Sequence, residues 1–464
     1  MTLNSLSNDL LLDITELVAL PTQVFYPTRD CYKQATKDLL SFMLCSKRYQ
    51  LVVERVLYQR FVQNTPYALL KFRKTLLAKP RLLQYVRKVQ LRDLEGTDLD
   101  PEGVLSDILN LFQFPTEIKR DIEFLEARLS LWYEESISTL LLLPNLEDIT
   151  ITRASRNPTA SFPFFNTLRN LLLTHPANSK AQTPQLSNLR KLAIEYHDLN
   201  YRTRAGFEDT EFLLALPSLT TFDGDRLLDR EWAPSSPDAM FQLRTLRLRE
   251  SNLSPTVIRN LLSCCPLLEY LIYEHDKHHD KESSFFPHYF RESIAQLQPC
   301  LQSLELYRSE KGQYATYISE EFTTIGSLVP FQKLRYLSIT AHLLLGPQKF
   351  RGSDWYSKAC KFGPHQCETQ SLANCVPESL EHLRLKDCGS KIFEHVSELL
   401  NEPIPNLKFI TLCFKHIGGF GNNESSWSDG NRVGGRSIAS HSKGIEKLER
   451  ACRDRGVVLA IGYF

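Results

Sequence analysis

The chain has 464 residues, and its 55 Lys and Arg residues balance 54 Asp and Glu residues, giving a formal net charge of +1. This near-neutrality excludes the strong positive field of a general nucleic-acid or anionic-membrane binder. Hydrophobic residues make up 42% of the chain, so a large core can form, either in several domains or in one elongated array.

The cysteines and the N-terminal residues indicate an intracellular protein. The 11 cysteines include no C-x-x-C pair, so we expect reduced thiols and a location in the cytoplasm and/or the nucleus. Asn8, Asp9 and Asp13 interrupt any signal-peptide core. No apolar run approaches the roughly 20 residues of a membrane span. We therefore expect no membrane partner and no nucleic-acid partner.

The first predicted elements are two short amphipathic helices. Ser7 is expected to cap a helix whose apolar stripe includes Leu10 and Ile14. Leu6 can pack against Leu11 as a hydrophobic staple. The helix ends before residues 21–27, which contain two prolines, and a second apolar helix is expected from about residue 33. Neither stripe has an obvious partner of matching period in the chain.

The sequence "LSNDLLLDITELV…DLLSFMLCSKRYQLVV" resembles an F-box, whose usual form is L-P-x-E-L-L-x-x-I followed by D-L-x-x-x-x-x-V-C-x-x-W. Ser7 replaces the usual Pro, Leu44 the usual Val and Tyr49 the usual Trp, and residues 21–36 form an insertion. An F-box followed by leucine-rich units is similar to the layout of many fungal F-box proteins. The matching residues are Leu6, Asp9, Leu10, Leu11, Ile14, Leu39, Leu44, Cys45, Lys47, Arg48 and Tyr49.

The resemblance implies that the helices bind a Skp-type adaptor, which links the chain to a cullin-RING ubiquitin ligase. The apolar stripes would then form an interface with another protein. The alternative is a plain helical cap on the open end of a solenoid. The residues that would bind the adaptor, or brace the helices that do, are Leu6, Leu10, Leu11, Ile14, Leu39, Leu44 and Tyr49.

A repeated frame, L-x-x-L-x-L, dominates the rest of the chain. In this frame x-L-x-L-x is a strand with alternate residues pointing inward. The frame recurs mostly at about the 20–29 residue spacing of leucine-rich repeats, which predicts an α/β solenoid with parallel strands on its concave face. The first leucines of the ten copies are Leu146, Leu168, Leu189, Leu219, Leu243, Leu268, Leu301, Leu334, Leu380 and Leu407.

Several units contain local signals that refine this prediction. The copy at Leu168 is expected to be a strand within residues 165–173, and residues 85–91 are expected to begin the sheet. Ser254 followed by Pro255 predicts a helix N-terminus on the convex side. The alternative fold is a globular α/β domain whose L-x-L pairs are buried parallel strands.

The C-terminal residues are expected to cap the solenoid with a helix, a C-cap at Gly456 and a last strand. The predicted organisation is an F-box-like helical domain (1–62), a helical linker with the first solenoid elements (63–142), leucine-rich repeats (143–416), a mobile loop (417–443) and a C-terminal cap (444–464).

The concave face is the predicted site for a target protein, because residues flanking the inward leucines line it. Its charges are of both signs, which favours a protein over nucleic acid. Each of these residues taken singly is better explained as an ordinary solvated strand residue, and only the face as a whole is predicted to bind a target. The set is Arg247, Arg249, Glu274, Glu305, Tyr307, Arg384 and Lys386.

Signs of catalysis are weak, so we expect no enzyme activity and no cofactor. Phosphate-loop, serine-hydrolase and H-E-x-x-H motifs are absent from the sequence. Two stretches could hold a metal, although their spacing matches no common zinc template, and both are interpreted as loops. They contribute His275, Asp276, His278, His279 and Asp280, and Cys360, His365, Cys367 and Cys375.

The sequence therefore predicts the substrate-recognition subunit of a Skp-cullin-F-box ubiquitin ligase. The alternative is a leucine-rich interaction scaffold without a ligase role, and a metal-dependent enzyme is a remote third hypothesis.

Overall fold

The computed structural model describes residues 6–19, 29–63, 66–92, 133, 136–153, 163–174, 186–196, 207–229, 231–275, 287–308, 324–346, 371–388, 391–402, 404–414 and 434–463. Their contacts divide the chain into two compact units, residues 1–205 with 209–223, and residues 206–208 with 224–464. Each unit combines helices with a parallel sheet, so the chain is an α/β protein with the architecture of a leucine-rich solenoid.

The first unit begins with three helices and continues into four parallel strands, β1 to β4, which pair in chain order. Helix α8 (Phe207–Leu214) and strand β5 (Thr221–Asp225) cross the division between the units. The other elements of the first unit are α1 (Asn8–Ala19), α2 (Arg29–Met43), α3 (Lys47–Gln59), β1 (Arg60–Val62), α4 (Pro66–Ala78), η2 (Pro80–Gln84), β2 (Lys88–Arg92), β3 (Asp148–Arg153), α7 (Pro163–Thr174) and β4 (Lys191–Tyr196).

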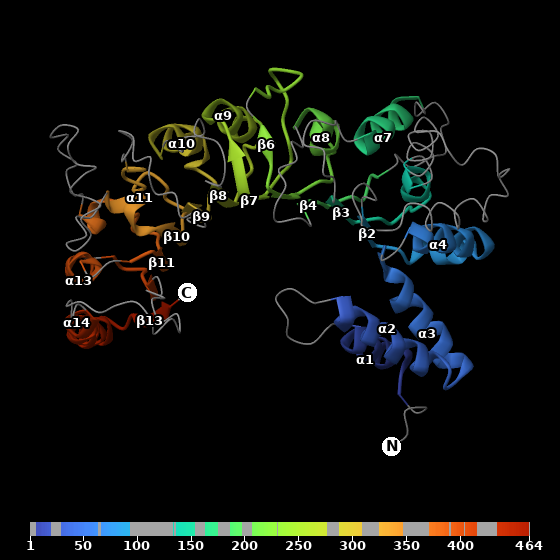
Figure 1. The fold of residues 1–464 in the computed structure, drawn as a ribbon, viewed down its shortest axis with the longest axis horizontal. Helices are drawn as coiled ribbons and strands as arrows, with labels where there is room; N and C mark the ends of the chain where they lie inside the picture. Colours follow the sequence, from blue (N-terminus) through green and yellow to red (C-terminus); the bar gives the residue numbers. More distant parts are fainter. Residues whose placement is uncertain are drawn as a thin grey trace, which may run out of the picture. The chain divides into compact units, whose positions relative to one another are not determined.

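The second unit continues the same pattern, and its strands β7 to β13 also pair in parallel and in chain order. Its helices lie along one side of the sheet, and the other side carries no helix among the described residues (Figure 1). The elements are β6 (Leu228–Asp229), β7 (Thr245–Leu253), α9 (Pro255–Ser263), β8 (Tyr270–His275), α10 (Pro287–Ile294), η4 (Ala295–Leu297), β9 (Ser303–Arg308), β10 (Tyr336–Thr340), α11 (Ala341–Leu345), η5 (Leu372–Asn374), β11 (His382–Lys386), α13 (Ile392–Asn401), β12 (Phe409–Phe414), α14 (Gly434–Asp454) and β13 (Val458–Tyr463).

The leucine frame forms the core, as expected. All ten first leucines are buried, and most are completely inaccessible to solvent. Within the strands the burial alternates, so that Leu304 and Leu306 of β9 are buried while Glu305 and Tyr307 are partly exposed. The helices contribute the opposite wall of this core, for example through Val257 and Leu261 of α9. Each repeat therefore buries its leucines against its own helix and its neighbours.

Leu168 is buried in a helix, which corrects the prediction of a strand at residues 165–173. Phe164, Phe165 and Leu168 are buried while Asn166 and Arg169 are exposed, which is the spacing of one helix face. Pro163 at the first helical position suits this start. The spacing of the L-x-x-L-x-L motif also fits one face of a helix, and here it forms a helix. Strands β3 and β4 are therefore neighbours in the sheet, and α7 lies between them in the chain.

The sheet begins earlier than residues 85–91. Strand β1 starts at Arg60, directly after α3 ends at Gln59, and it pairs in parallel with β2. The N-terminal helical region therefore includes the first strand. A strand of three residues is too short to show an alternating pattern, which explains why the sequence did not indicate it.

The turns before β3–β5 and before β8–β12 repeat a hydrogen-bond pattern. The backbone carbonyl of the residue after one frame leucine accepts from two successive N–H groups of the next repeat. For example, Glu381 and His382 both donate to the Arg335 carbonyl, at 2.8 and 2.9 Å, and Lys408 and Phe409 both donate to the Glu381 carbonyl. This repeated arrangement satisfies the backbone at the turns and sets the strand register.

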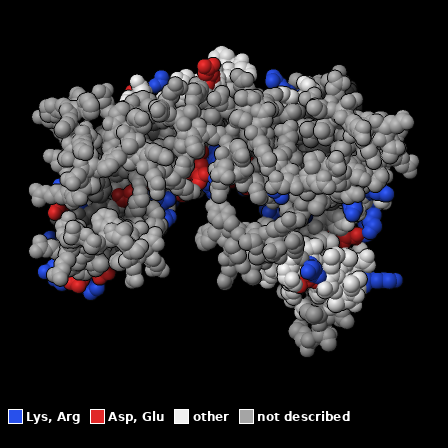
Figure 2. All heavy atoms as spheres, in the orientation of Figure 1, with Lys and Arg blue, Asp and Glu red and all other residues white. Residues whose placement is uncertain are grey.

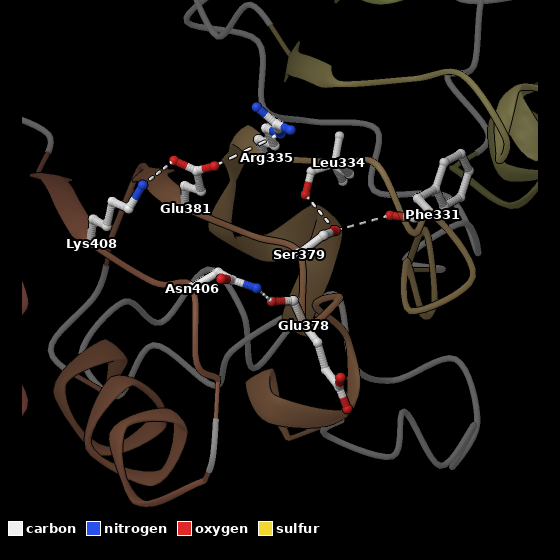
Figure 3. Close-up of polar contacts among 8 residues, drawn as sticks. All are labelled: Phe331, Leu334, Arg335, Glu378, Ser379, Glu381, Asn406 and Lys408. Carbon is white, nitrogen blue, oxygen red and sulfur yellow. Dashed lines mark hydrogen bonds and ion pairs between the residues drawn. The ribbon is translucent and has the colours of Figure 1, made fainter.

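The same position carries a row of mostly charged side chains, which we call the charge ladder, and its neighbouring charges have opposite signs except where the neutral Thr220 and Gln302 interrupt the row. Glu381 accepts from Lys408 at 2.6 Å and lies 3.8 Å from Arg335 on its other side (Figure 3). The hydrogen bond from Lys408 holds the pKa of Glu381 below its ordinary value. In the first unit Arg87 pairs with Glu147 at 2.6 Å. The members are Arg87, Glu147, Arg190 and Thr220 in the first unit, and Arg244, Glu269, Gln302, Arg335, Glu381 and Lys408 in the second.

Polar side chains close the turns beside the charge ladder. Ser379 Oγ donates to the Leu334 carbonyl at 2.8 Å, and Asn406 Nδ2 donates to the Glu378 carbonyl at 3.0 Å (Figure 3). Asn145 and Asn188 make equivalent bonds to the preceding repeat in the first unit. These asparagines stand directly before frame leucines, so a local sequence feature links one repeat to the next.

The C-terminal cap has the expected helix, glycine and strand. Gly456 has φ +70°, and the Val457 N–H bonds to the Cys452 carbonyl while the Gly456 N–H bonds to the Arg453 carbonyl. This pair of bonds is a Schellman motif. Helix α14 starts at Gly434, so residues 434–443 are helical and not part of a loop, because a packed helix extends at little cost into adjoining residues. The rest of the predicted loop, residues 417–433, lies outside the described residues.

Candidate functional site

The first candidate surface is the three-helix bundle α1–α3. Its centre holds Leu11, Leu39 and Tyr49, whose exposed fractions are 0%, 4% and 5%. The rings of Phe42 and Tyr49 stack with centroids 4.8 Å apart. These residues brace the helices from inside. The sequence analysis found no partner for the apolar stripes of the first two helices. In the structure, α1 and α2 pack partly on each other and partly on α3, a helix that the sequence pattern did not indicate.

The bundle nevertheless leaves large apolar side chains in solvent. Of the residues predicted to bind an adaptor, Leu44 is 83% exposed and Leu10 is 46% exposed, while Leu6 and Ile14 are partly exposed. Leu51 of α3 is 59% exposed, and the amphipathic period of residues 47–59 could have indicated it. The other exposed members are Leu17, Val18 and Leu40. The described atoms of the bundle that face the viewer in Figure 2 are mostly uncharged.

Ser7, which departs from the F-box pattern, and Arg48, which matches it, both have clear structural roles in the bundle. Ser7 Oγ accepts from the Leu10 N–H at 3.2 Å and caps α1. Arg48 donates to Asn8 Oδ1 at 2.9 Å and to the Leu6 carbonyl, which fixes the start of α1 against α3. The Ser at position 7 and the Tyr at position 49 are therefore compatible with a stable bundle.

The second candidate surface is the face of the β7–β13 sheet opposite the buried leucines, which we call the open face. Strand register places Glu305 of β9 beside Ser338 of β10, and Ser338 beside Arg384 of β11. It also places Glu274 of β8 beside Tyr307 of β9. Five of the seven residues predicted to bind a target thus lie on β8, β9 and β11, and β10 contributes Ser338 between them.

A network of contacts links the central residues of this face. The Tyr307 hydroxyl donates to the Glu305 carboxylate and lies 2.8 Å from the Ser338 hydroxyl. Lys386 Nζ lies 3.2 Å from the centroid of the Tyr307 ring, in a cation–π contact. Ser338 is fully buried beneath these longer side chains. The network therefore holds Tyr307 and Lys386 in fixed positions.

Burial shifts the proton affinities in this network. Burial raises the pKa of Tyr307, and its hydrogen bond to Glu305 raises the pKa further. Burial also lowers the pKa of Lys386, helped by the charge of Arg384 and opposed by Glu305 and Glu274. The tyrosine hydroxyl consequently keeps its proton well above neutral pH and continues to donate to Glu305.

Arg247 and Arg249 lie apart from the network, on β7. Arg247 is paired with Ile272 of β8, so one strand separates it from Glu305. The β7–β8 register then shifts between Leu248 and Ser251, which displaces Arg249 from the regular rows. The sequence frame could not indicate this irregularity, because the leucine spacing continues unchanged through Leu248.

The described residues contain no group of three His, Cys, Asp or Glu able to hold a metal, and they include only two residues of the stretches considered as possible metal sites, His275 and Cys375. His275 is 2% exposed, and its Nδ1 lies 3.0 Å from the Tyr273 hydroxyl. Cys375 is fully buried. Asp276, His278, His279, Asp280, Cys360, His365 and Cys367 lie outside the described residues.

In the part of the chain that the structure describes, no helix has the length and apolar character needed to cross a membrane.

Comparison with known proteins identifies the repeats. No curated protein matches the chain. Residues 195–410 match the model of a leucine-rich repeat domain, and such domains are typically non-catalytic modules with an extended binding surface. The chain therefore contains a leucine-rich repeat domain, which is a scaffold for protein–protein interaction.

Proposed function

We propose that this chain is the substrate-recognition subunit of a Skp-cullin-F-box ubiquitin ligase. The helical bundle binds a Skp-type adaptor and through it a cullin-RING ligase, and the leucine-rich repeats hold a target protein on the open face. The ubiquitin transfer is carried out by other subunits.

The observation that carries the proposal is the exposed apolar surface of the bundle. Three short helices with a small core present Leu10, Leu17, Leu44 and Leu51 to solvent, and several large exposed apolar side chains on one small bundle favour protein contact. This surface lies on the segment that resembles an F-box. The order of parts, a helical region followed by leucine-rich repeats, supports the same interpretation.

Replacing Leu10 and Leu44 by Asp tests this proposal directly. Neither side chain belongs to the buried centre of the bundle, so the bundle should still fold, and circular dichroism checks that it does. We expect affinity for a purified Skp-type adaptor to fall by at least about 30-fold, because loss of central apolar anchors costs about 2 kcal/mol or more. Isothermal titration calorimetry on the full-length chain measures this change.

A matched control distinguishes a specific interface from general stickiness. Leu267→Asp with Val329→Asp removes two apolar side chains that are 42% and 48% exposed in the second unit. This control should bind the adaptor like the unmodified chain. Failure of the unmodified chain to bind the adaptor, or equal binding by the Leu10→Asp, Leu44→Asp variant, would leave an interaction scaffold without a ligase role.

A further inference from the structure

An aromatic row crosses the open face near the starts of the strands. Strand register places Tyr336 of β10 beside His382 of β11, His382 beside Phe409 of β12, and Phe409 beside Val458 of β13. The His382 and Phe409 rings stack with centroids 4.5 Å apart. Phe409 is 39% exposed and Val458 is 54% exposed. The aromatic row therefore offers an apolar surface to a partner.

A pair of cations lies next to the aromatic row, closer to the C-terminal ends of the same strands. Arg384 and Lys386 follow His382 on β11, with the same side-chain alternation. Their neighbours on the open face have short side chains: Ser338 and Thr340 on β10, and Thr411, which is itself beside Ala460 of β13. Both cations are partly exposed on this face.

Charge on this part of the face is one-sided. Among the described residues, the open face of β10–β13 carries Arg384 and Lys386 but no carboxylate. The nearest acids on the face, Glu305 and Glu274, lie on β9 and β8. Burial disfavours the charged form of Lys386, so an anion placed beside it would recover electrostatic energy. The complementary partner is acidic.

We propose that the open face of β10–β13 binds an extended acidic segment of the target protein. The segment crosses the strands, places an aromatic or aliphatic side chain on the aromatic row, and directs carboxylates to Arg384 and Lys386. Strands about 4.8 Å apart make this crossing about 15 Å long, which four or five extended residues span. This inference rests on the proposed role of the repeats in holding a target.

Selection from a random dodecapeptide library displayed on phage, using the full-length chain as bait, tests the inference. We expect enrichment of peptides that carry Asp or Glu next to Phe, Trp or Leu. Arg384→Met with Lys386→Met retains the aliphatic stems, and it should weaken the selected peptides by about tenfold or more in fluorescence anisotropy. Phe409→Ala should weaken the same peptides without altering charge.

The matched control removes two cations elsewhere. Lys447→Met with Arg450→Met changes exposed residues of α14, and it should leave peptide affinity unchanged. Selection of peptides without acidic residues, equal binding by the Arg384→Met, Lys386→Met variant, or no enrichment at all would overturn the inference. Adaptor binding measured on the same preparations reports separately on the ligase proposal, because it depends on residues of the helical bundle.

Discussion

Single residues on the open face illustrate how far sequence alone could identify the site. Glu305, Tyr307, Arg384 and Lys386 were predicted to share one face because each flanks an inward leucine. Their contacts were not predictable, because they depend on which residues of β9, β10 and β11 lie side by side. Ser338, which completes the network, has an ordinary side chain in the sequence and gains its role only from register.

At Tyr307 the network predicts a measurable loss of stability. Tyr307→Phe removes the hydroxyl that contacts Glu305 and the buried Ser338, and an unsatisfied buried partner costs about 1 kcal/mol or slightly more. Urea unfolding followed by circular dichroism measures this loss. Tyr270→Phe is the control, because Tyr270 is 45% exposed and should change stability by less than about 0.5 kcal/mol. Equal effects of the two changes would refute the role of the network.

The ends of helices were predicted well where a residue type has one characteristic local role, such as capping. Ser7 and Ser254 cap helices through their hydroxyls, and Gly456 ends α14 with a positive φ. The prediction at Leu168 was wrong because the same spacing of leucines fits a strand and one face of a helix. Only the burial of Phe164 and Phe165 together with Leu168 distinguishes the two.

The end of α14 supports a prediction at this scale. Gly456 has φ +70°, and a Cβ added there would meet no atom within 4 Å, so a substitution is opposed by backbone strain alone. Gly456→Ala should destabilise the fold by about 1 kcal/mol, as measured by thermal or urea unfolding. Gly456→Asn should cost less, because Asn tolerates the left-handed region better. The reverse order would contradict a left-handed cap.

For the molecule as a whole, the repeat frame predicted the class of fold, an α/β solenoid, although the lengths of its repeats are uneven. Composition and net charge argued against a general nucleic-acid or membrane binder but could not indicate a binding surface. Strand order decides which charged side chains lie together on the open face. The net charge of +1 is a sum over the whole chain, so it carries no information about one face.

Buried thiols make the whole fold sensitive to high pH. Burial raises the pKa of Cys375 and of Cys452 to about 11, above the ordinary thiol value of 9.0. The unfolded chain loses these protons first, so the stability that they contribute is complete below pH 9 and declines as the pH rises to about 11. The loss is on the order of 2 kcal/mol per thiol.

Urea unfolding at pH 7.5 and at pH 10.5 would measure this decline. The unmodified chain should lose more stability between the two conditions than a Cys375→Ala, Cys452→Ala variant does. Cys45 is exposed, so Cys45→Ala should behave like the unmodified chain. The same pH dependence in all three proteins would show that Cys375 and Cys452 do not contribute to the loss of stability at high pH.

The charge ladder also encodes the order of the repeats. In the second unit, Glu381 stands between Arg335 and Lys408 and pairs with both. Loss of the repeat that carries Glu381 would bring two cations together, although the leucines on either side could still pack. Leucines are interchangeable between repeats, whereas signs are not. The opposite charges around Glu381 therefore disfavour misfolded states in which one repeat is skipped. The apolar core cannot discriminate against such states, because its leucines pack equally well in either register.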